Sequence, residues 1–454
     1  MADSVDLGEV RALMVTHLDN AGIARAKVLP AAALGSAATH GVTISNSVGM
    51  LFSVDDYLNE TPQLDAVVGD LRGIPDLSAL AMLDPATGLA WAPADLHALD
   101  GAVHPACTRS ALRRVVADAA DAGFAFRVGF ELECTLFRGT RAEPVLANDG
   151  PGYSARAVLE LEAWMLDSLA ALETAGVPVS QLHPEFGNGQ LEFAFAPRDP
   201  ITAVDQLALA RIVLTRVANA HGLRVSFAPV PIAGGSTNGC HVHLSATRHG
   251  RALFAASDVI PGVVAPHDAT STFTEDGGRM IAGILDRLDE GVALLGGSVL
   301  SFRRLQPHSW AGADVCWGPA NREAAVRFVG GQAGEAVEQS NIEVKPVDSA
   351  ANPYLAVAAI LAAAVDGVAR SAVLPAPVHV DPSRLSDEER AAAGIRRLPA
   401  DLGTALDLLE RSAFFREVFG GVLLDAYLAT RRHEWEAYGT KVPDTVASAV
   451  RWRY

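Results

Sequence analysis

Short apolar runs separated by turn residues fill the first hundred positions of the chain. The runs ALMVTHL and IARAKVL flank Asn20-Ala21-Gly22, a pattern that predicts a β-hairpin over residues 11–30. Two further runs, VTISNSVGMLF and LAMLDPATGLAWAP, are broken by Gly, Pro and Asp. We therefore expect a small β-rich domain over residues 8–100, followed by a larger domain over residues 104–454.

In the larger predicted domain, stretches with helical hydrophobic periodicity alternate with strand-like stretches. Apolar residues at helical spacing predict helices over residues 108–122, 154–175 and 200–221, each followed by a glycine. Between and after them stand strand-like runs. No glycine-rich loop of the P-loop or dinucleotide-binding type is present. The pattern thus predicts an α+β fold with a substantial antiparallel sheet rather than a Rossmann fold. The strand-like runs are FRVGFELECTLF, PVSQLHPEF, GQLEFAFAP, LRVSFAPVP, CHVHLSA, ADVCWG and AAVRFVG.

Charge and composition exclude several classes of protein. The 454 residues carry a net charge of −17, which repels phosphate backbones and anionic bilayers, so we expect neither a nucleic acid nor a membrane as partner. Four cysteines without a C-x-x-C pair suit a reducing cytoplasm. The acidic N-terminus and the charged Asp366 and Arg370 within the apolar run 355–374 argue against a signal peptide and a membrane span. We expect a cytoplasmic protein.

Carboxylates recur on the predicted strands. In GFELECTLF the two-residue period places Glu131, Glu133 and Thr135 on one face. Two like charges so close need a compensating cation or hydrogen-bond donor. A solvated face of an edge strand is the alternative for one such pair alone.

Other strands repeat this arrangement. In CHVHL, His241 and His243 project together, either as ligands or as surface histidines. Carboxylate oxygens with few imidazoles favour Mg²⁺ or Mn²⁺ over zinc. The full set comprises five carboxylates, too many for independent solvated faces: Glu131, Glu133, Glu185, Glu192 and Glu343.

A basic set accompanies the acidic one. Arg303 and Arg304 lie in SFRRLQP, and Arg322 and Arg327 lie in NREAAVR. Each arginine alone is readily explained as a surface ion-pair partner. Beside bound metal ions, guanidinium groups would stabilise a transferring phosphoryl group through bidentate contacts. The combination points to phosphoryl transfer.

Six segments in order resemble the glutamine synthetase family: GFELE, HPEFGNGQLE, NGCHVH, RRLQP, WGPANREAAVR and IEVKPVDSAANPYLAVAAIL. The resemblance extends over nearly the whole chain. It implies a small N-terminal β-grasp-like domain and a catalytic domain whose strands form a bifunnel. It also implies a homo-oligomeric ring, often a dodecamer, with active sites between adjacent subunits.

The resemblance further implies a two-step reaction and a role for each matching residue. ATP phosphorylates the γ-carboxylate of glutamate, and an amine then displaces phosphate. Two or more Mg²⁺ or Mn²⁺ ions assist. The implied ligands are Glu133, Glu185 and Glu192 for one ion and Glu131, His241 and Glu343 for a second; His243, Arg327 and Lys345 would contact ATP, Gly239 and Arg304 glutamate, and Arg322 and Arg327 the transferred phosphate.

Two departures from the family pattern concern the amine. Members that use ammonia carry an aspartate where this chain has Ser45 or Asn46, and a glutamate where it has Trp310. Without these anions, ammonium in a desolvated pocket lacks compensating charge. We therefore expect an organic amine, either a polyamine such as putrescine or spermidine or a monoamine such as ethanolamine.

The amine pocket itself leaves alternatives open. Trp310 would line an apolar channel, stack on an alkylammonium, or simply pack as a buried tryptophan. The acidic loop residues Asp55, Asp56 and Glu60 would meet a distal ammonium of a polyamine, or are merely solvated. Lys345 replaces the family's usual arginine and lacks its fork geometry.

Two other functions compete with an amine ligase. One is an ordinary ammonia-using glutamine synthetase with another residue as base. The other is a non-catalytic relative with a structural or regulatory role, against which the retention of all the implied metal ligands argues.

Overall fold

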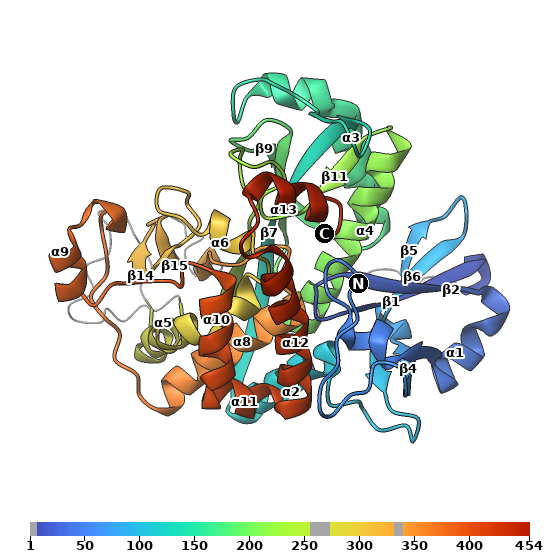
Figure 1. The fold of residues 1–454 in the computed structure, drawn as a ribbon, viewed down its shortest axis with the longest axis horizontal. Helices are drawn as coiled ribbons and strands as arrows, with labels where there is room; N and C mark the ends of the chain where they lie inside the picture. Colours follow the sequence, from blue (N-terminus) through green and yellow to red (C-terminus); the bar gives the residue numbers. More distant parts are fainter. Residues whose placement is uncertain (1–6, 255–272, 331–338) are drawn as a thin grey trace.

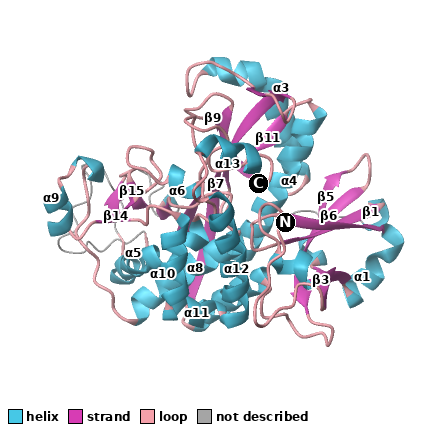
Figure 2. Cartoon of the chain, in the orientation of Figure 1, coloured by secondary structure: helices cyan, strands magenta, loops and turns pink. Residues whose placement is uncertain are grey.

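The computed structural model describes residues 7–254, 273–330 and 339–454. Two β-sheets and a set of helices form the fold (Figure 1). The N-terminal sheet lies at one side of the molecule, and the strands of the longer sheet run through its centre. Helices gather against the lower part of the central sheet, as Figure 2 shows. The predicted α+β fold is confirmed.

The N-terminal sheet begins with the predicted hairpin. β1 (Ala12–Leu18) pairs antiparallel with β2 (Ala24–Pro30) and parallel with β6 (Leu89–His97). The strand order is β2-β1-β6-β4-β3, where β3 is Val42–Ser45 and β4 is Asp70–Pro75, and β5 (Ala81–Asp84) pairs with β6.

Only the beginning of the run VTISNSVGMLF is a strand. β3 ends at Ser45, and a short helical turn of π type spans Ser47–Leu51. Met50 and Leu51 are buried in this turn. A short apolar run is compatible with a buried strand or a buried helical turn, so the apolar pattern alone did not distinguish the two.

The central sheet has the order β17-β14-β15-β16-β12-β7-β10-β9, with β8 and β11 paired to β7 and β13 paired to β12. Among its described pairs, β14 and β15 alone run parallel, so the predicted antiparallel character is confirmed. The strands are β7 (Phe124–Gly139), β8 (Pro144–Leu146), β9 (Val179–Pro184), β10 (Gln190–Phe195), β11 (Arg224–Ser226), β12 (Cys240–Arg248), β13 (Arg251–Ala252), β14 (Asp314–Pro319), β15 (Ala324–Val329), β16 (Asn341–Val344) and β17 (Arg396–Arg397).

The predicted helices are confirmed to within two residues at each end. Ser154 caps α3 by accepting from the backbone of Ala157, and Asp199 caps α4 in the same way. The described helices are α1 (Leu34–His40), α2 (Thr108–Asp121), α3 (Ala155–Thr174), α4 (Pro200–Ala220), α5 (Glu275–Leu295), α6 (Ser301–Arg304), α8 (Pro353–Ala369), α9 (Asp387–Ala392), α10 (Leu402–Arg411), α11 (Ala413–Phe419), α12 (Gly421–Tyr438) and α13 (Pro443–Val450).

Helices α5 and α8 pack closely through glycines. A Cβ added to Gly283 would lie 2.6 Å from Cα of Gly367, so the backbones meet at a distance that larger residues forbid. This contact buries the apolar run that α8 supplies. Among the described helices, none combines the length and the apolar character that a bilayer crossing requires.

The four cysteines are buried and unpaired, as their spacing predicts. Among the described strands, those of the N-terminal sheet all precede those of the central sheet along the sequence. The domain boundary near residue 100 stays a prediction.

Candidate active site

Strand β7 presents carboxylates on one face. Glu131 and Glu133 alternate with Leu132 and Cys134, whose side chains are fully buried in the core. Because neighbouring strand residues point to opposite faces, this packing turns both carboxylates away from the core. The predicted alternation is confirmed.

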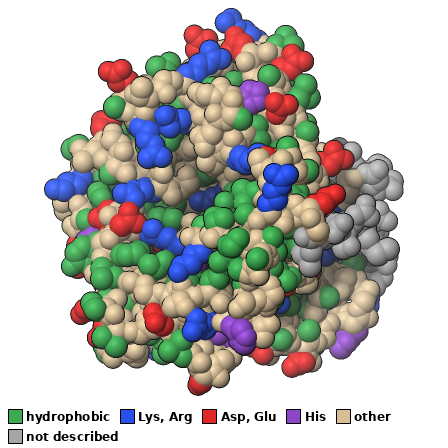
Figure 3. All heavy atoms as spheres, turned by 90° about the vertical axis from the view of Figure 1, so that its right-hand side faces the viewer, with side chains coloured by type: hydrophobic (Ala, Val, Ile, Leu, Met, Phe, Trp, Pro, Cys, Tyr) green, Lys and Arg blue, Asp and Glu red, His purple; other side chains and the backbone are tan. Residues whose placement is uncertain are grey.

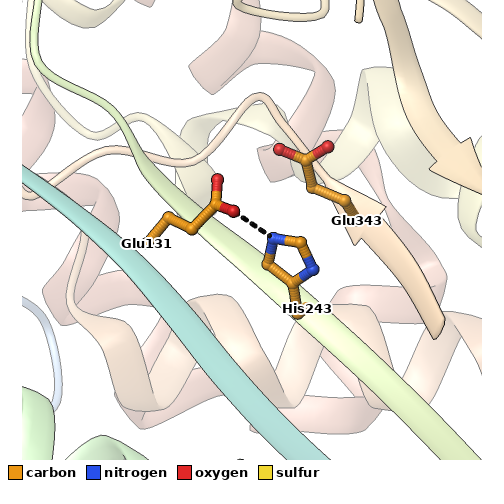
Figure 4. Close-up of side chains that lie close together, drawn as sticks. All are labelled: Glu131, His243 and Glu343. Atoms are coloured by element: carbon orange, nitrogen blue, oxygen red, sulfur yellow. Dashed lines mark ion pairs between the residues drawn. The ribbon is translucent and has the colours of Figure 1, made fainter. Parts of the chain in front are cut away.

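Strand β12 lies antiparallel beside β7 and adds the two histidines. His241 stands opposite Glu131, and its Nδ1 lies 3.2 Å from Oε2 of that carboxylate. Nε2 of His243 lies 3.1 Å from the other oxygen of Glu131. Figure 4 shows Glu131, His243 and Glu343 pointing toward one another from β7, β12 and β16. Three strands thus deliver one cluster.

Glu343 is the most enclosed member, with 0% of its side chain exposed. Lys345 Nζ donates to its Oε1 at 3.0 Å, Arg327 donates to its Oε2, and Nδ1 of His241 lies 3.2 Å from Oε1. Burial opposes ionisation, but the charges of Lys345, His241 and Arg327 hold the pKa of Glu343 well below its ordinary value. The buried carboxylate is therefore ionised.

The other members are electrostatically coupled in the same way. Burial opposes ionisation of Glu131, but hydrogen bonds from His241 and His243 lower its pKa. Burial disfavours charged His243, but its contact with Glu131 and the charge of Glu343 raise the histidine pKa. The lowered pKa of Glu131 and the raised pKa of His243 show that the ionised carboxylates stabilise positive charge next to them.

A second part of the site comes from β9 and β10. Nε2 of His183 lies 3.1 Å from Oε1 of Glu192, and this hydrogen bond is the main cause that raises the pKa of His183 to about 9. Tyr153 donates to Oε2 of Glu185 at 2.8 Å. The sequence reasoning missed His183, although the spacing in His-Pro-Glu places it on the same side as Glu185.

Within the described ranges, ligand-type atoms converge in three overlapping groups, each within 4.8 Å: Glu131, His243 and Glu343; Glu131, Glu192 and His241; and His183, Glu185 and Glu192. The family resemblance implied that Glu133, Glu185 and Glu192 bind one metal ion together and that His243 contacts ATP. The observed groups instead include His243 and omit Glu133. Carboxylate oxygens with a minority of imidazoles fit a hard divalent cation such as Mg²⁺ or Mn²⁺.

Hydrogen bonds explain why Glu133 is not part of the three observed groups. Its Oε2 accepts from the backbone N–H of Gly239 and from Nε2 of Gln190, both at 2.9 Å. Gly239 also leaves room for its neighbours, because a Cβ there would lie 2.6 Å from Nε2 of His241 and 2.7 Å from Nη2 of Arg304. A larger residue at this position would displace the side chains of His241 and Arg304.

Arg304 is a buried cation at the edge of the cluster. Its Nη2 lies 3.0 Å from Nε2 of His241 and 3.1 Å from the carbonyl oxygen of Lys345. Its Nη1 is buried and has no hydrogen-bond partner among the described residues. A buried guanidinium N–H without an acceptor is costly, so this atom is suited to bind an anionic group of a ligand.

Arg322 and Trp310 form a separate contact. The guanidinium of Arg322 lies 5.6 Å from the Trp310 ring centroid, and no described carboxylate of the cluster pairs with it. Trp310 is 52% exposed, so the alternative of a buried packing tryptophan is wrong. Its backbone N–H donates to Glu323 at 3.0 Å, a contact that sequence reasoning missed.

The other altered segment lies at the end of β3 in the N-terminal sheet, with Ser45 as the last strand residue and Asn46 directly after it. Ser45 Oγ lies 2.8 Å from Ser47 Oγ, and the amide of Asn46 donates to the carbonyls of Asp65 and Val68. No contact found among the described residues joins Ser45 or Asn46 to the cluster of their own chain.

The nearby acidic loop has partners within the chain. Asp55 lies 3.2 Å from Nε2 of His433. Asp56 pairs with Arg25 at 2.9 Å and with Arg453 at 2.6 Å. An amine that approaches these two carboxylates would compete with existing partners.

Comparison with known proteins places these features in a family. The model of the glutamine synthetase catalytic domain matches residues 105–448. A gamma-glutamylpolyamine synthetase, GlnA3 of Streptomyces coelicolor, is 42% identical over 98% of this chain and 94% of that protein. A glutamine synthetase of Staphylococcus aureus is 30% identical over 77% of this chain and 76% of that protein.

Solved structures agree with the sequence matches. A crystal structure of a novel glutamine synthase homolog has a TM-score of 0.84 and 31% identity, and the match covers 98% of this chain and 99% of that one. A GmaS/ADP complex has a TM-score of 0.81 and 25% identity, with 98% of both chains covered. The central sheet, its acid–histidine cluster and these matches together show that the chain belongs to the glutamine synthetase family.

Proposed function

We propose that this protein is an ATP-dependent ligase that joins the γ-carboxylate of L-glutamate to an organic amine. The observation that carries the proposal is the acid–histidine cluster around Glu131, which is bordered by the cations Arg304 and Arg327. Such a site suits divalent ions, a nucleotide and a substrate carboxylate together. The name of the relative that is 42% identical, a gamma-glutamylpolyamine synthetase, supports the same reaction class.

The chain's own residues would hold the reactants in place. Arg304 would bind the substrate carboxylate with its unpartnered Nη1, while Gly239 leaves room for this approach. Arg327 lies beside Glu343 and would turn toward the phosphoryl group. Bound Mg²⁺ or Mn²⁺ would neutralise phosphate oxygens. The proposed ligands are Glu131, Glu133, Glu185, Glu192, His241 and Glu343, to which the observed groups add His183 and His243.

The reaction proceeds in two steps. A γ-carboxylate oxygen of glutamate attacks the terminal phosphorus of ATP, the bond to the β-phosphate oxygen breaks, and ADP leaves. The amine nitrogen then attacks the acyl carbon, the bond to the phosphate oxygen breaks, and the nitrogen loses a proton. Positioning and charge neutralisation supply most of the acceleration in such transfers.

The altered positions support an organic amine rather than ammonium. Ser45, Asn46 and Trp310 supply no negative charge for a bare ammonium ion. The exposed indole of Trp310 offers an aromatic face to an alkylammonium, although Arg322 lies over that ring in the structure. We propose a polyamine such as putrescine or spermidine before ethanolamine, since the relative with 42% identity is named for polyamines.

Phosphate release with glutamate, ATP, Mg²⁺ and a panel of amines tests the proposal. The panel contains ammonium, ethanolamine, putrescine and spermidine, and mass spectrometry identifies each amide. We expect the highest kcat/KM with a polyamine. Higher turnover with ammonium than with any organic amine would establish an ordinary glutamine synthetase instead.

A non-catalytic role makes a different prediction. A regulatory or structural relative would release no phosphate with any amine, and calorimetry would detect no binding of ATP with Mg²⁺. The Glu131→Gln variant serves as the control for the assay, because it removes the carboxylate shared by two of the observed groups.

We further propose a ring assembly, often a dodecamer in this family, with Ser45 and Asn46 completing a neighbour's site. Their lack of contact with the cluster of their own chain supports this arrangement. Analytical ultracentrifugation tests the assembly, and a monomer at full activity would contradict it.

A further inference from the structure

A cavity of about 330 Å³ lies away from the acid–histidine cluster, at the junction of three parts of the chain. Its walls come from the hairpin between β1 and β2, from α4 with β11, and from the C-terminal residues Trp452 and Tyr454. None of its lining residues belongs to the three groups of metal-ligand type. The volume lies in the range of small-molecule sites.

Cationic side chains predominate in this cavity. Arg141, Arg211, Arg224 and Arg453 line it, and among the described residues no aspartate or glutamate does; Tyr454, which also lines it, carries the terminal carboxylate of the structure. Arg453 pairs with Asp56, which Arg25 also contacts. The chain as a whole carries a net charge of −17, so a cavity lined by cations runs against its average composition.

Three of these arginines have no carboxylate partner. Within the described ranges, no ion pair involves Arg141, Arg211 or Arg224. Arg211 stacks on the ring of Phe227 at 5.4 Å, and Nε of Arg224 is buried without a hydrogen-bond partner. Burial also lowers the pKa of Arg211. Arg211 and Arg224 are half-buried, whereas Arg141 is exposed. A buried guanidinium N–H is normally paired, so the Nε of Arg224 presents unmet hydrogen-bonding capacity.

The rest of the lining is apolar and aromatic. Ile23, Ile212 and Val225 contribute aliphatic walls, and Phe227 and Trp452 contribute rings. Figure 3 shows one face of the molecule on which an apolar area is bordered by Lys and Arg side chains. A cavity with apolar walls and a few convergent donors is the usual form of a specific ligand site.

We propose that this cavity binds a small organic anion, whose carboxylate or phosphate groups pair with Arg211 and Arg224 while its carbon skeleton contacts the apolar walls. Planar guanidinium groups match both oxyanions by bidentate hydrogen bonds. The site is separate from the reaction centre. Strand β11, which carries Arg224, pairs with the strand of Glu131 and Glu133, so the ligand would be bound next to a catalytic strand.

Calorimetry with the full-length protein tests the proposal. Citrate and phenyl phosphate are titrated separately into protein freed of metal ions by dialysis against chelator-free buffer, since a metal-free acidic cluster repels anions. We expect one of the two to bind, which distinguishes carboxylate from phosphate recognition. Arg211→Gln and Arg224→Gln should each weaken binding about tenfold or more, because a charge-assisted hydrogen bond is lost. The control is Arg114→Gln, which removes an exposed arginine on α2.

Absence of binding by both anions in the wild-type protein would overturn the proposal, as would equal affinity in wild type and both variants. Arg224→Lys keeps the charge and should retain part of the affinity, which separates recognition from misfolding. Hydrogen–deuterium exchange of the wild-type protein needs no variant. Protection by the anion should appear in residues 208–227 and 452–454, and protection confined to β7, β12 and β16 would place the anion in the reaction centre instead.

Discussion

Asn341 fixes the orientation of His243. Nδ1 of the ring lies 2.9 Å from Oδ1 of Asn341, which can only accept, so Nδ1 carries a hydrogen, and Nε2 lies 3.1 Å from Glu131, with which it pairs when the ring is protonated. Once Nε2 loses its proton, the bond to Asn341 keeps the hydrogen on Nδ1 and leaves Nε2 as the nitrogen that can bind an ion.

Replacing Asn341 by alanine should therefore weaken Mn²⁺ binding by roughly 10- to 100-fold. Electron paramagnetic resonance titration of free Mn²⁺ measures the change. Asn341→Asp keeps an acceptor and should retain most of the affinity. If alanine and aspartate behave alike, Asn341 has no positioning role.

Glu343 should contribute strongly to stability as well as to ion binding. Glu343→Gln leaves Arg327 and Lys345 without a shared buried counter-charge, and such breaks cost about 3–5 kcal/mol. Urea unfolding measures the loss of free energy. Glu160→Gln removes one partner of a surface pair with Arg156 and should cost about 1 kcal/mol or less. Similar losses of unfolding free energy in the two variants would show that the buried ion pairs of Glu343 stabilise the fold no more than a surface pair does.

Trp310 should govern the choice of amine. Trp310→Glu places an anion where ammonia-using members have one, and we expect the ratio of kcat/KM for ammonium to that for putrescine to rise about tenfold. Trp310→Phe keeps an aromatic ring without charge and should leave the ratio close to that of the wild type. An unchanged ratio in the glutamate variant would remove Trp310 from the amine pocket.

His17 should make stability depend on pH. The ring is buried, and desolvation lowers its pKa from 6.5 to about 4, although its hydrogen bond to the carbonyl of Val48 acts in the opposite direction. Between these values the unfolded chain binds more protons than the folded one, so stability falls as the pH decreases through this window. The expected contribution is about 3 kcal/mol.

Urea unfolding at about pH 7 and at about pH 4 measures this contribution. Carboxylates also titrate in this range, so the comparison is with His17→Gln, which lacks the ring. The free energy of the variant should depend less on pH. Parallel curves for wild type and variant would assign the dependence to other groups.

The pattern of alternating residues was enough to predict the strands that carry the site. Leu132 and Cys134 alternate with Glu131 and Glu133, and the core accepts only the apolar pair, so the sequence determines which face each carboxylate takes. Helix boundaries at residues 154–175 were predictable because caps and glycines act locally.

Only the tertiary structure decided which residues meet. The register between β7 and β12 sets His241 opposite Glu131, and no local rule fixes the register of strands so far apart in the sequence. Glu133 accepts a hydrogen bond from the backbone of Gly239, and His183 is hydrogen-bonded to Glu192. Both contacts join residues from different strands or loops. Local composition dictates faces and element ends, whereas pairing across long loops depends on the packing of the whole chain.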